Sequence, residues 1–237
     1  MSLLAMVLPI LPGQREHWNR FVDEINTTRR QEFVESRRRL GLHERTFLQE
    51  TPMGDLVVLT LEGENPLRML DWFRSGDPFA RWMGQEVAPI HGADLSQPLP
   101  ESFLPQQVMD TGNDVSGDNY VATVLPILPG KTQEWRDFVA EITGPRWQEF
   151  VASRQRMGLR QRVFYQSTPN GDLSVVVIDG AEPRKFAQWF ASSEPLARWV
   201  SQRLQELTGV NVGQAWSRGG ASRLVADTEK ESLSRAA

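Results

Sequence analysis

The chain contains one sequence twice, and this duplication constrains its fold more than any other feature. The string LPILPG at Leu8–Gly13 returns unchanged at Leu125–Gly130, an offset of 117 residues. The two copies then align without a gap as far as Thr111 and Thr228, with roughly two-fifths of the paired positions identical. A repeat of this length is a small domain rather than a solenoid unit. We therefore predict a first repeat over residues 1–111, a polar linker over 112–119, a second repeat over 120–228 and a disordered tail over 229–237.

Composition excludes several classes of protein. The formal net charge of −4 argues against a general binder of nucleic acid or of anionic membranes. The absence of cysteine excludes disulfides and thiolate metal sites, and it fits a cytoplasmic protein. The apolar run Leu3–Leu11 is not expected to be a signal peptide, because no basic residue precedes it and its copy, Tyr120–Leu128, lies in the middle of the chain. Neither run approaches the ~20 apolar residues that span a bilayer.

Each copy is predicted to run strand, helix, strand, strand, helix, strand. Apolar residues at i, i+3, i+4 and i+7 indicate the first helix of each copy, and Gly, Pro and Asn mark the turns. In the first copy we expect a strand over Leu4–Leu11, a helix with Trp18, Phe21, Val22 and Ile25 on one face, a second helical stretch over Arg29–Leu40 ended by Gly41, a hairpin over Arg45–Thr51 and Leu56–Leu61, a helical region interrupted at Gly76-Asp77-Pro78, and a short strand over Gln106–Asp110.

This βαββαβ order is that of a ferredoxin-like unit, so the predicted fold class is α+β. Two helices cover one face of such a sheet, and the other face must be buried against something. The second copy is the obvious partner. We therefore expect two tandem ferredoxin-like repeats to form a single-chain, pseudo-dimeric α/β barrel, either as a monomer or with further self-association.

Several strings within this framework resemble a known group of proteins. They are AMVLPILPG and ATVLPILPG, ESRRRLGL, TPMGDLVV, SGDPFARW and IHGADLSQP. With the element order, they make the chain similar to a tandem, uncharacterised bacterial member of the dimeric α/β-barrel superfamily. The resemblance extends distantly to antibiotic-biosynthesis-type monooxygenases. It implies a small organic ligand, no cofactor, and a pocket between helices and sheet. The superfamily also includes haem-degrading and haem-using enzymes and isomerases.

Arginine is retained on an inward helix face in both copies. Arg37 falls between Phe33 and Val34 on the apolar face of the helix Arg29–Leu40, and Arg154 occupies the equivalent position. A buried arginine is costly unless it is paired. One interpretation is a salt bridge to a buried acid, or a guanidinium that reaches water. The other is a pocket-lining group that binds an anion or an oxygen atom.

One face of a strand is identical in the two copies. Arg45, Phe47, Gln49 and Thr51 return as Arg162, Phe164, Gln166 and Thr168, whereas the alternate residues all differ. Packing between sheets explains this pattern. Alternatively, Arg45, Phe47, Gln49 and Gln166 line a ligand cavity between sheet and helices.

Tryptophan and histidine supply the remaining candidates. Trp72 and Trp189 are paired beside a helix break and are either core residues or pocket-lining residues. His91 lies three residues before Asp94 at a helix end, and only the first copy has this pair. One interpretation is a His–Asp dyad for proton transfer. The other is that His91 caps the C-terminus of the helix. His17 and His43 are predicted to be solvated.

Other site types lack the residues that they need. The chain has no zinc-ligand spacing, no HExxH, no GxGxxG and no phosphate-loop pattern, and no Ser–His–Asp triad can be specified. Three functional hypotheses stay open. The first is a cofactor-free, monooxygenase-like enzyme, with the first half the better candidate for activity through Arg37, His91 and Asp94. The second is a non-catalytic structural or binding barrel. The third is a haem-binding protein, which would require one of the three histidines.

Overall fold

The computed structural model describes residues 1–112, 115, 119–180, 184–217 and 222–230, and it divides into two compact units. Unit 1 comprises residues 1–101 and 223–237, and unit 2 comprises residues 102–222. Much of the predicted linker, 112–119, and most of the predicted tail, 229–237, fall outside the described residues. In the described part of the chain, no helix is both long enough and apolar enough to cross a membrane.

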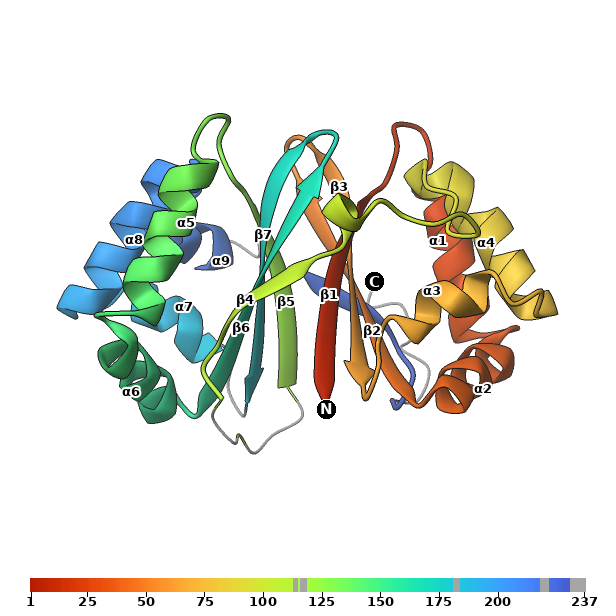
Figure 1. Ribbon diagram of the computed structural model, residues 1–237, viewed down its shortest axis with the longest axis horizontal. Helices are drawn as coiled ribbons and strands as arrows, with labels where there is room; N and C mark the ends of the chain where they lie inside the picture. Colours follow the sequence, from red (N-terminus) through yellow and green to blue (C-terminus); the bar gives the residue numbers. More distant parts are fainter. Residues whose placement is uncertain (113–114, 116–118, 181–183, 218–221, 231–237) are drawn as a thin grey trace. The chain divides into compact units, whose positions relative to one another are not determined.

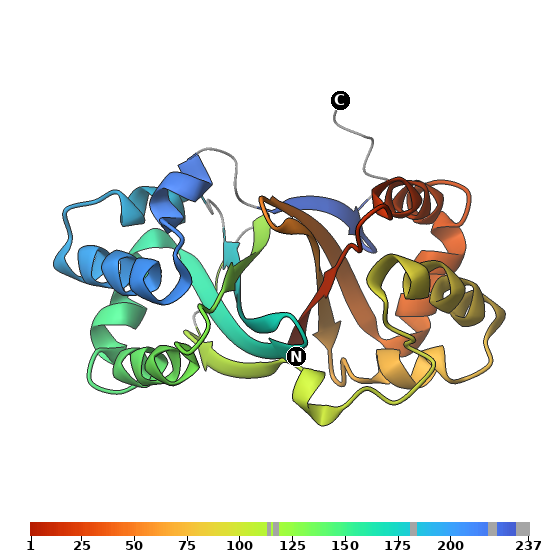
Figure 2. The ribbon, with the colours of Figure 1, turned by 90° about the horizontal axis from the view of Figure 1, so that it is seen from above.

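Each unit is one antiparallel four-stranded sheet with helices on one of its faces (Figures 1 and 2), which confirms the α+β class. Unit 1 has the strand order β1-β3-β2-β8, and unit 2 has the order β4-β6-β7-β5. Unit 1 contains β1 (Ser2–Pro9), α1 (Arg15–Asn26), α2 (Arg30–Leu40), β2 (Leu42–Thr51), β3 (Gly54–Gly63), α3 (Arg68–Phe73), α4 (Pro78–His91) and β8 (Arg223–Asp227). Unit 2 contains β4 (Gln106–Asp110), β5 (Asn119–Pro126), α5 (Thr132–Thr143), α6 (Trp147–Met157), β6 (Leu159–Thr168), β7 (Gly171–Gly180), α7 (Arg184–Phe190), α8 (Pro195–Thr208) and α9 (Val212–Ser217).

The last strand of each repeat pairs in the sheet of the other copy. β4 ends the first repeat but pairs with β6, and β8 ends the second repeat but pairs with β2. Three prolines between α4 and β4, at positions 98, 100 and 105, favour an extended chain there. The boundaries of the compact units therefore differ from the predicted boundaries of the repeats.

Local signals explain the helix ends. Gly41 and Gly158 both have φ of +68° and end α2 and α6 in the left-handed conformation that glycine favours. Asp77 caps α4, accepting hydrogen bonds from the backbone N–H groups of Phe79 and Ala80, with Pro78 at the first helical position. The prediction of a helix break at Gly76-Asp77-Pro78 is thus confirmed.

Helix α9 was not predicted from the sequence. It occurs in the second copy alone among the described residues, and the equivalent segment of the first copy is irregular. Pro98 and Pro100 of the first copy correspond to Ala215 and Ser217 of the second. Proline removes a backbone donor and clashes with the preceding helical turn, so the exchange permits a helix in the second copy.

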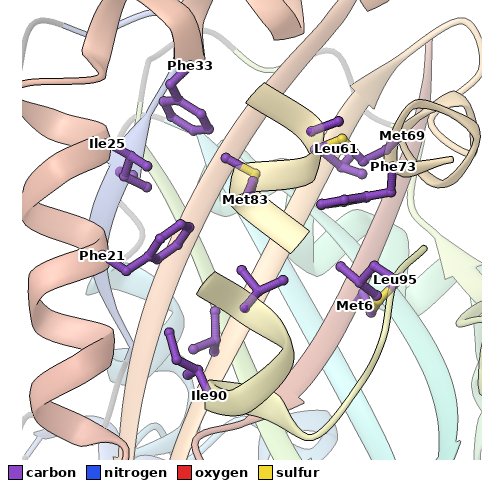
Figure 3. Packing of buried hydrophobic residues seen from close by; sticks show 14 of the residues in the cluster. Met6, Phe21, Ile25, Phe33, Leu61, Met69, Phe73, Met83, Ile90 and Leu95 are labelled. Atoms are coloured by element: carbon purple, nitrogen blue, oxygen red, sulfur yellow. The ribbon is translucent and has the colours of Figure 1, made fainter. Parts of the chain in front are cut away.

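The core of unit 1 lies between its sheet and its helices and is filled by large apolar side chains. Phe21 and Ile25 of α1 and Met83 of α4 enter this layer (Figure 3). Met6 of β1 and Leu61 of β3 belong to the same cluster. These five residues come from four elements, α1, α4, β1 and β3, and they pack into one cluster.

Aspartates at equivalent positions, one buried and one half-buried, hold the two exchanged edge strands. In unit 2, Asp110 of β4 accepts hydrogen bonds from Nε and Nη2 of Arg160, at 2.9 and 2.7 Å. In unit 1, Asp227 of β8 accepts a hydrogen bond from Nε2 of His43 at 2.7 Å. The His43 side chain is only 12% exposed, so the prediction that it is solvated is wrong. The corresponding arginine in unit 2 shows that this position serves strand pairing in both copies.

His43→Ala is expected to lower the free energy of unfolding by about 1–3 kcal/mol at neutral pH, because the buried Asp227 carboxylate loses one of its hydrogen-bond donors. The net effect of the folded structure is to lower the pKa of Asp227. Burial alone would raise this pKa, but the hydrogen bonds from His43 and the Glu229 N–H and the charge of Arg45 outweigh burial. A carboxylate with a depressed folded-state pKa stabilises the fold above its unfolded pKa and loses that effect as the pH falls through the folded value. Urea denaturation between about pH 5 and pH 2 measures the free energy of unfolding of both proteins. As the pH falls, this free energy should begin to decrease at a higher pH in the variant than in the wild type.

His17→Ala is the control for this experiment. The His17 ring contacts Glu86 at 2.7 Å, but both side chains are about one-quarter exposed. Such a pair contributes about 0–1 kcal/mol. Equal losses in the two variants would contradict the assigned role of His43.

Candidate functional site

The two retained arginines lie at the same place in each unit, under the helices and against the sheet. Arg37 of α2 and Arg154 of α6 are each 1% exposed. In unit 1 every nitrogen of the guanidinium has a partner. Nε donates to Glu44 Oε2 at 2.5 Å, Nη1 to Ser36 Oγ at 2.9 Å, and Nη2 to Met83 Sδ at 3.1 Å. Arg37 therefore forms a buried salt bridge with Glu44, which confirms the first of the two interpretations given above.

In unit 2 the equivalent arginine has no acidic partner. Gln161 replaces Glu44 and accepts from Nε of Arg154 at 2.7 Å, and Ser153 accepts from Nη1 at 2.8 Å. Val200 replaces Met83, which removes the sulfur that Nη2 contacts in unit 1. Among the described residues, Nη2 forms no hydrogen bond and no carboxylate lies within salt-bridge distance of Arg154. The second copy therefore keeps the buried cation and lacks its counter-charge.

The electrostatics reflect this difference. Burial lowers the pKa of Arg37, and Glu44 opposes that effect. Burial lowers the pKa of Arg154 to about 9, opposed by the more distant charge of Glu194. Glu194 itself pairs with Arg156 at 3.1 Å. Arg154 is still a cation at neutral pH, but its charge is poorly compensated, and an anion bound beside it would be strongly favoured.

Aromatic rings cover both guanidinium groups. The Arg37 guanidinium lies 4.6 Å from the ring centroid of Trp72, and that of Arg154 lies 4.1 Å from Trp189. Phe150 lies 4.0 Å from Arg154 on α6 itself. The paired tryptophans, predicted to be core or pocket-lining residues, are buried and stack on the arginines. Cation–π contacts of this kind partly offset the desolvation of a guanidinium but do not neutralise it.

A cavity of about 40 Å³ lies beside Arg154 between the helices and the sheet of unit 2. This volume holds roughly three water molecules. Most of its lining is apolar, with polar groups from Arg154, Gln161, Thr123 and Ser174. The Ser174 side chain is buried, and it is one of the few polar groups in this lining.

Exchanges between the copies explain why the cavity is there. Thr123 stands where unit 1 has Met6, Ser174 where it has Val57, and Val200 where it has Met83. Met83 and Met6 fill this layer in unit 1 (Figure 3). Three smaller side chains leave volume, and two of them, Thr123 and Ser174, add hydroxyl groups to the residues that line the cavity. Loss of volume and gain of polarity at one place are typical of a ligand site rather than of a core.

The identical strand face does not line this cavity. Leu48 and Val163 belong to the clusters packed under the helices, so alternation along β2 and β6 directs Phe47 and Phe164 to the opposite face of each sheet. Gln49, Gln166 and Arg45 lie on that same opposite face. The prediction that Phe47, Gln49 and Gln166 line a pocket between helices and sheet is therefore wrong. The positions that differ between the copies face the helices.

His91 and Asp94 do not meet. His91, the last residue of α4, is buried, and its Nδ1 donates to the backbone oxygen of Pro9 at 2.8 Å. Burial lowers its pKa to about 4. Asp94 is exposed and accepts hydrogen bonds from the N–H and hydroxyl of Ser96. The two side chains therefore form no dyad, and an imidazole that stays neutral is not a charged helix cap.

The three histidines lie on three different elements of unit 1, α1, β2 and α4. His17 pairs with Glu86, His43 with Asp227, and His91 with Pro9. No group of three or more His, Cys, Asp or Glu side chains suited to a metal ion occurs among the described residues. The three imidazoles are thus engaged in holding unit 1 together.

The key residues that the sequence analysis missed are Gln161, Thr123, Ser174 and Val200. The signal was available, because each of these residues differs from its counterpart in the other copy. Positions that are identical in the two copies are those that both units need for folding. Positions that differ indicate a property that unit 2 has and unit 1 lacks.

Comparisons with known proteins return solved structures of low sequence identity. No protein-family model matches the chain, and no curated protein matches it. An "anthrone oxidase-like protein" of known structure is 13% identical, with a TM-score of 0.47, over 87% of this chain and 86% of that one. A structure described as "Putative monooxygenase", from Fusobacterium nucleatum, is 8% identical, with a TM-score of 0.40, over 98% of this chain and 95% of that one.

Proposed function

We propose that unit 2 binds a small organic anion, with the negative group of the ligand on Arg154. The observation that carries this proposal is the exchange of Glu44 for Gln161, which leaves a fully buried guanidinium beside a cavity without a carboxylate. The Ser174 hydroxyl, which lines the cavity, and Nη2 of Arg154 would both donate to the same anion. Charge-assisted hydrogen bonds from arginine to a carboxylate or similar oxyanion are among the stronger ones in proteins.

The reaction that fits such a site is the cofactor-free oxygenation implied by the sequence resemblance. An enzyme of that kind activates the substrate itself, and on this proposal it does so by holding the substrate as an anion. A buried arginine would stabilise that anion in a site from which water is largely excluded. On this proposal Arg154 and Ser174 bind the substrate, and the second half of the chain is the active half rather than the first.

Unit 1 favours a second role, the non-catalytic one. Its arginine is paired with Glu44, and methionines fill the corresponding layer, so we assign unit 1 a structural function. The closure of both copies into one barrel is also part of our proposal. Small-angle X-ray scattering of the intact chain tests it, and an elongated, two-body particle would contradict it.

Gln161→Glu tests the binding proposal. The new carboxylate would pair with Arg154 as Glu44 pairs with Arg37, and it would displace an anionic ligand. Acetate should raise the melting temperature of the wild type more than acetamide does. In the variant the affinity for acetate should fall by about 30-fold, equivalent to ~2 kcal/mol. Thermal-shift titration with both compounds measures this.

Glu44→Gln is the matched control, because it makes the reverse exchange in unit 1 without touching the cavity. The extra acetate effect should survive in that variant. Equal responses of the wild type to acetate and acetamide, or unchanged acetate binding by Gln161→Glu, would contradict the proposal.

A further inference from the structure

A second hollow adjoins the cavity of unit 2. It is an open groove of about 340 Å³ between α5 and the strands β4 and β6, lined by Trp135, Val139, Thr143 and Tyr165 among others. Trp135 and Val139 also line the inner cavity. These two side chains therefore form the wall between the groove and the Arg154 cavity.

Unit 1 has a hydrogen bond between helix and edge strand at this point, and the described part of unit 2 lacks it. In unit 1, Asn26 at the end of α1 donates through Nδ2 to the Val225 oxygen of β8 at 2.8 Å, which ties helix to edge strand. The second copy has Thr143 instead, and its hydroxyl donates to the Val139 oxygen of its own helix at 2.9 Å. The counterpart of Val225 is Val108, which lines the groove. A single exchange thus removes the bridge from α5 to β4.

The groove also carries aromatic surface that unit 1 lacks. Tyr165 stands where unit 1 has Leu48, and its ring lies 5.6 Å from that of Trp135. The guanidinium of Arg136, which replaces Asn19, lies 5.1 Å from the Tyr165 ring. Two neighbouring rings, tilted at 35° to each other, and a planar cation form a surface on which another aromatic ring can pack.

The two hollows differ in volume, so they can hold different parts of a ligand. About 40 Å³ accommodates an anionic head group, whereas 340 Å³ falls within the range of pockets that hold small organic ligands, roughly 300–1,000 Å³. We propose that the groove is the outer half of the same site, and that the ligand is an elongated aromatic anion. Its charged end would lie at Arg154 and its rings on Tyr165 and Trp135, entering past Val139. This inference rests on the proposed function and adds the chemical class of the ligand.

Thr143→Asn tests the inference, because it would place an amide where Asn26 has one, within reach of the Val108 oxygen. The probes are 2-naphthoate, its neutral analogue 2-naphthamide, and acetate, each measured by calorimetric titration. The wild type should bind 2-naphthoate at least about 10-fold more tightly than acetate. The variant should lose that advantage and bind acetate as the wild type does.

Tyr165→Leu provides a second route to the same result, since it removes the stacking surface and restores the residue found in unit 1. Asn26→Thr makes the reverse exchange in unit 1 and should leave 2-naphthoate binding unchanged. If Thr143→Asn and Tyr165→Leu both bind 2-naphthoate as tightly as the wild type does, while Gln161→Glu does not, the groove assignment is overturned and the anion site stands. If acetate and 2-naphthoate bind no better than their amides, the proposed function fails as well.

Discussion

Glu44→Ala is expected to lower the free energy of unfolding by about 3–5 kcal/mol. The substitution leaves the guanidinium of Arg37 buried at 1% exposure with no counter-charge. Its remaining partners are Ser36 Oγ and Met83 Sδ, neither of which is charged. Urea denaturation followed by circular dichroism measures the loss.

Two further variants distinguish the destabilisation caused by an unpaired buried charge from the net stabilisation that the ion pair provides. Glu44→Gln should cost less than Glu44→Ala, because an amide oxygen still accepts from Nε, as Gln161 does from Arg154 at 2.7 Å. The double variant Arg37→Met, Glu44→Leu should be more stable than Glu44→Ala alone, since it removes both charges. A double variant less stable than Glu44→Ala would contradict the argument.

Trp135→Ala is expected to cost a similar amount, about 3–5 kcal/mol. Trp135 is 2% exposed and packs from α5 against the core of unit 2, and its ring is part of the wall between the groove and the cavity. Its loss removes a large apolar surface and joins the two hollows. The free energy of unfolding from urea denaturation gives the magnitude.

Trp199→Ala is the control within the same unit. Its indole lies on α8, is half-buried, and stands 5.3 Å from Phe138 and 4.2 Å from the Arg146 guanidinium. Because less apolar area leaves water at this position, we expect roughly half the loss. A Trp135→Ala variant no less stable than Trp199→Ala would show that the wall does not contribute to packing.

Much of the local structure could be predicted from the sequence because its causes are local. The spacing of Trp18, Phe21 and Ile25 gives α1 one apolar face, and these residues are buried as expected. Gly41 ends a helix because its backbone is left-handed, and Asp77 begins one because its carboxylate satisfies two backbone donors. Each of these effects acts within a few residues of the chain.

The candidate site was only partly predictable. Helical periodicity placed Arg37 and Arg154 on an inward face, which the structure confirms. The partner of each arginine lies on the following strand and faces it only once helix and sheet have packed. A closed ion pair and an open anion site thus differ by one carboxylate changed to an amide. The effect of that change depends on how deeply the arginine is buried, and this burial depends on several elements together.

The sequence alone determined the duplication, the order of strands and helices, and the α+β class, since turn residues and apolar periodicity act along the chain. The tertiary structure alone decided where the last strand of each repeat pairs, which face of β2 and β6 meets the helices, and where volume was left unfilled. Strand pairing joins residues more than a hundred positions apart in β8 and β2. A cavity is the sum of many side-chain volumes from separate elements, so it exists only when those elements meet.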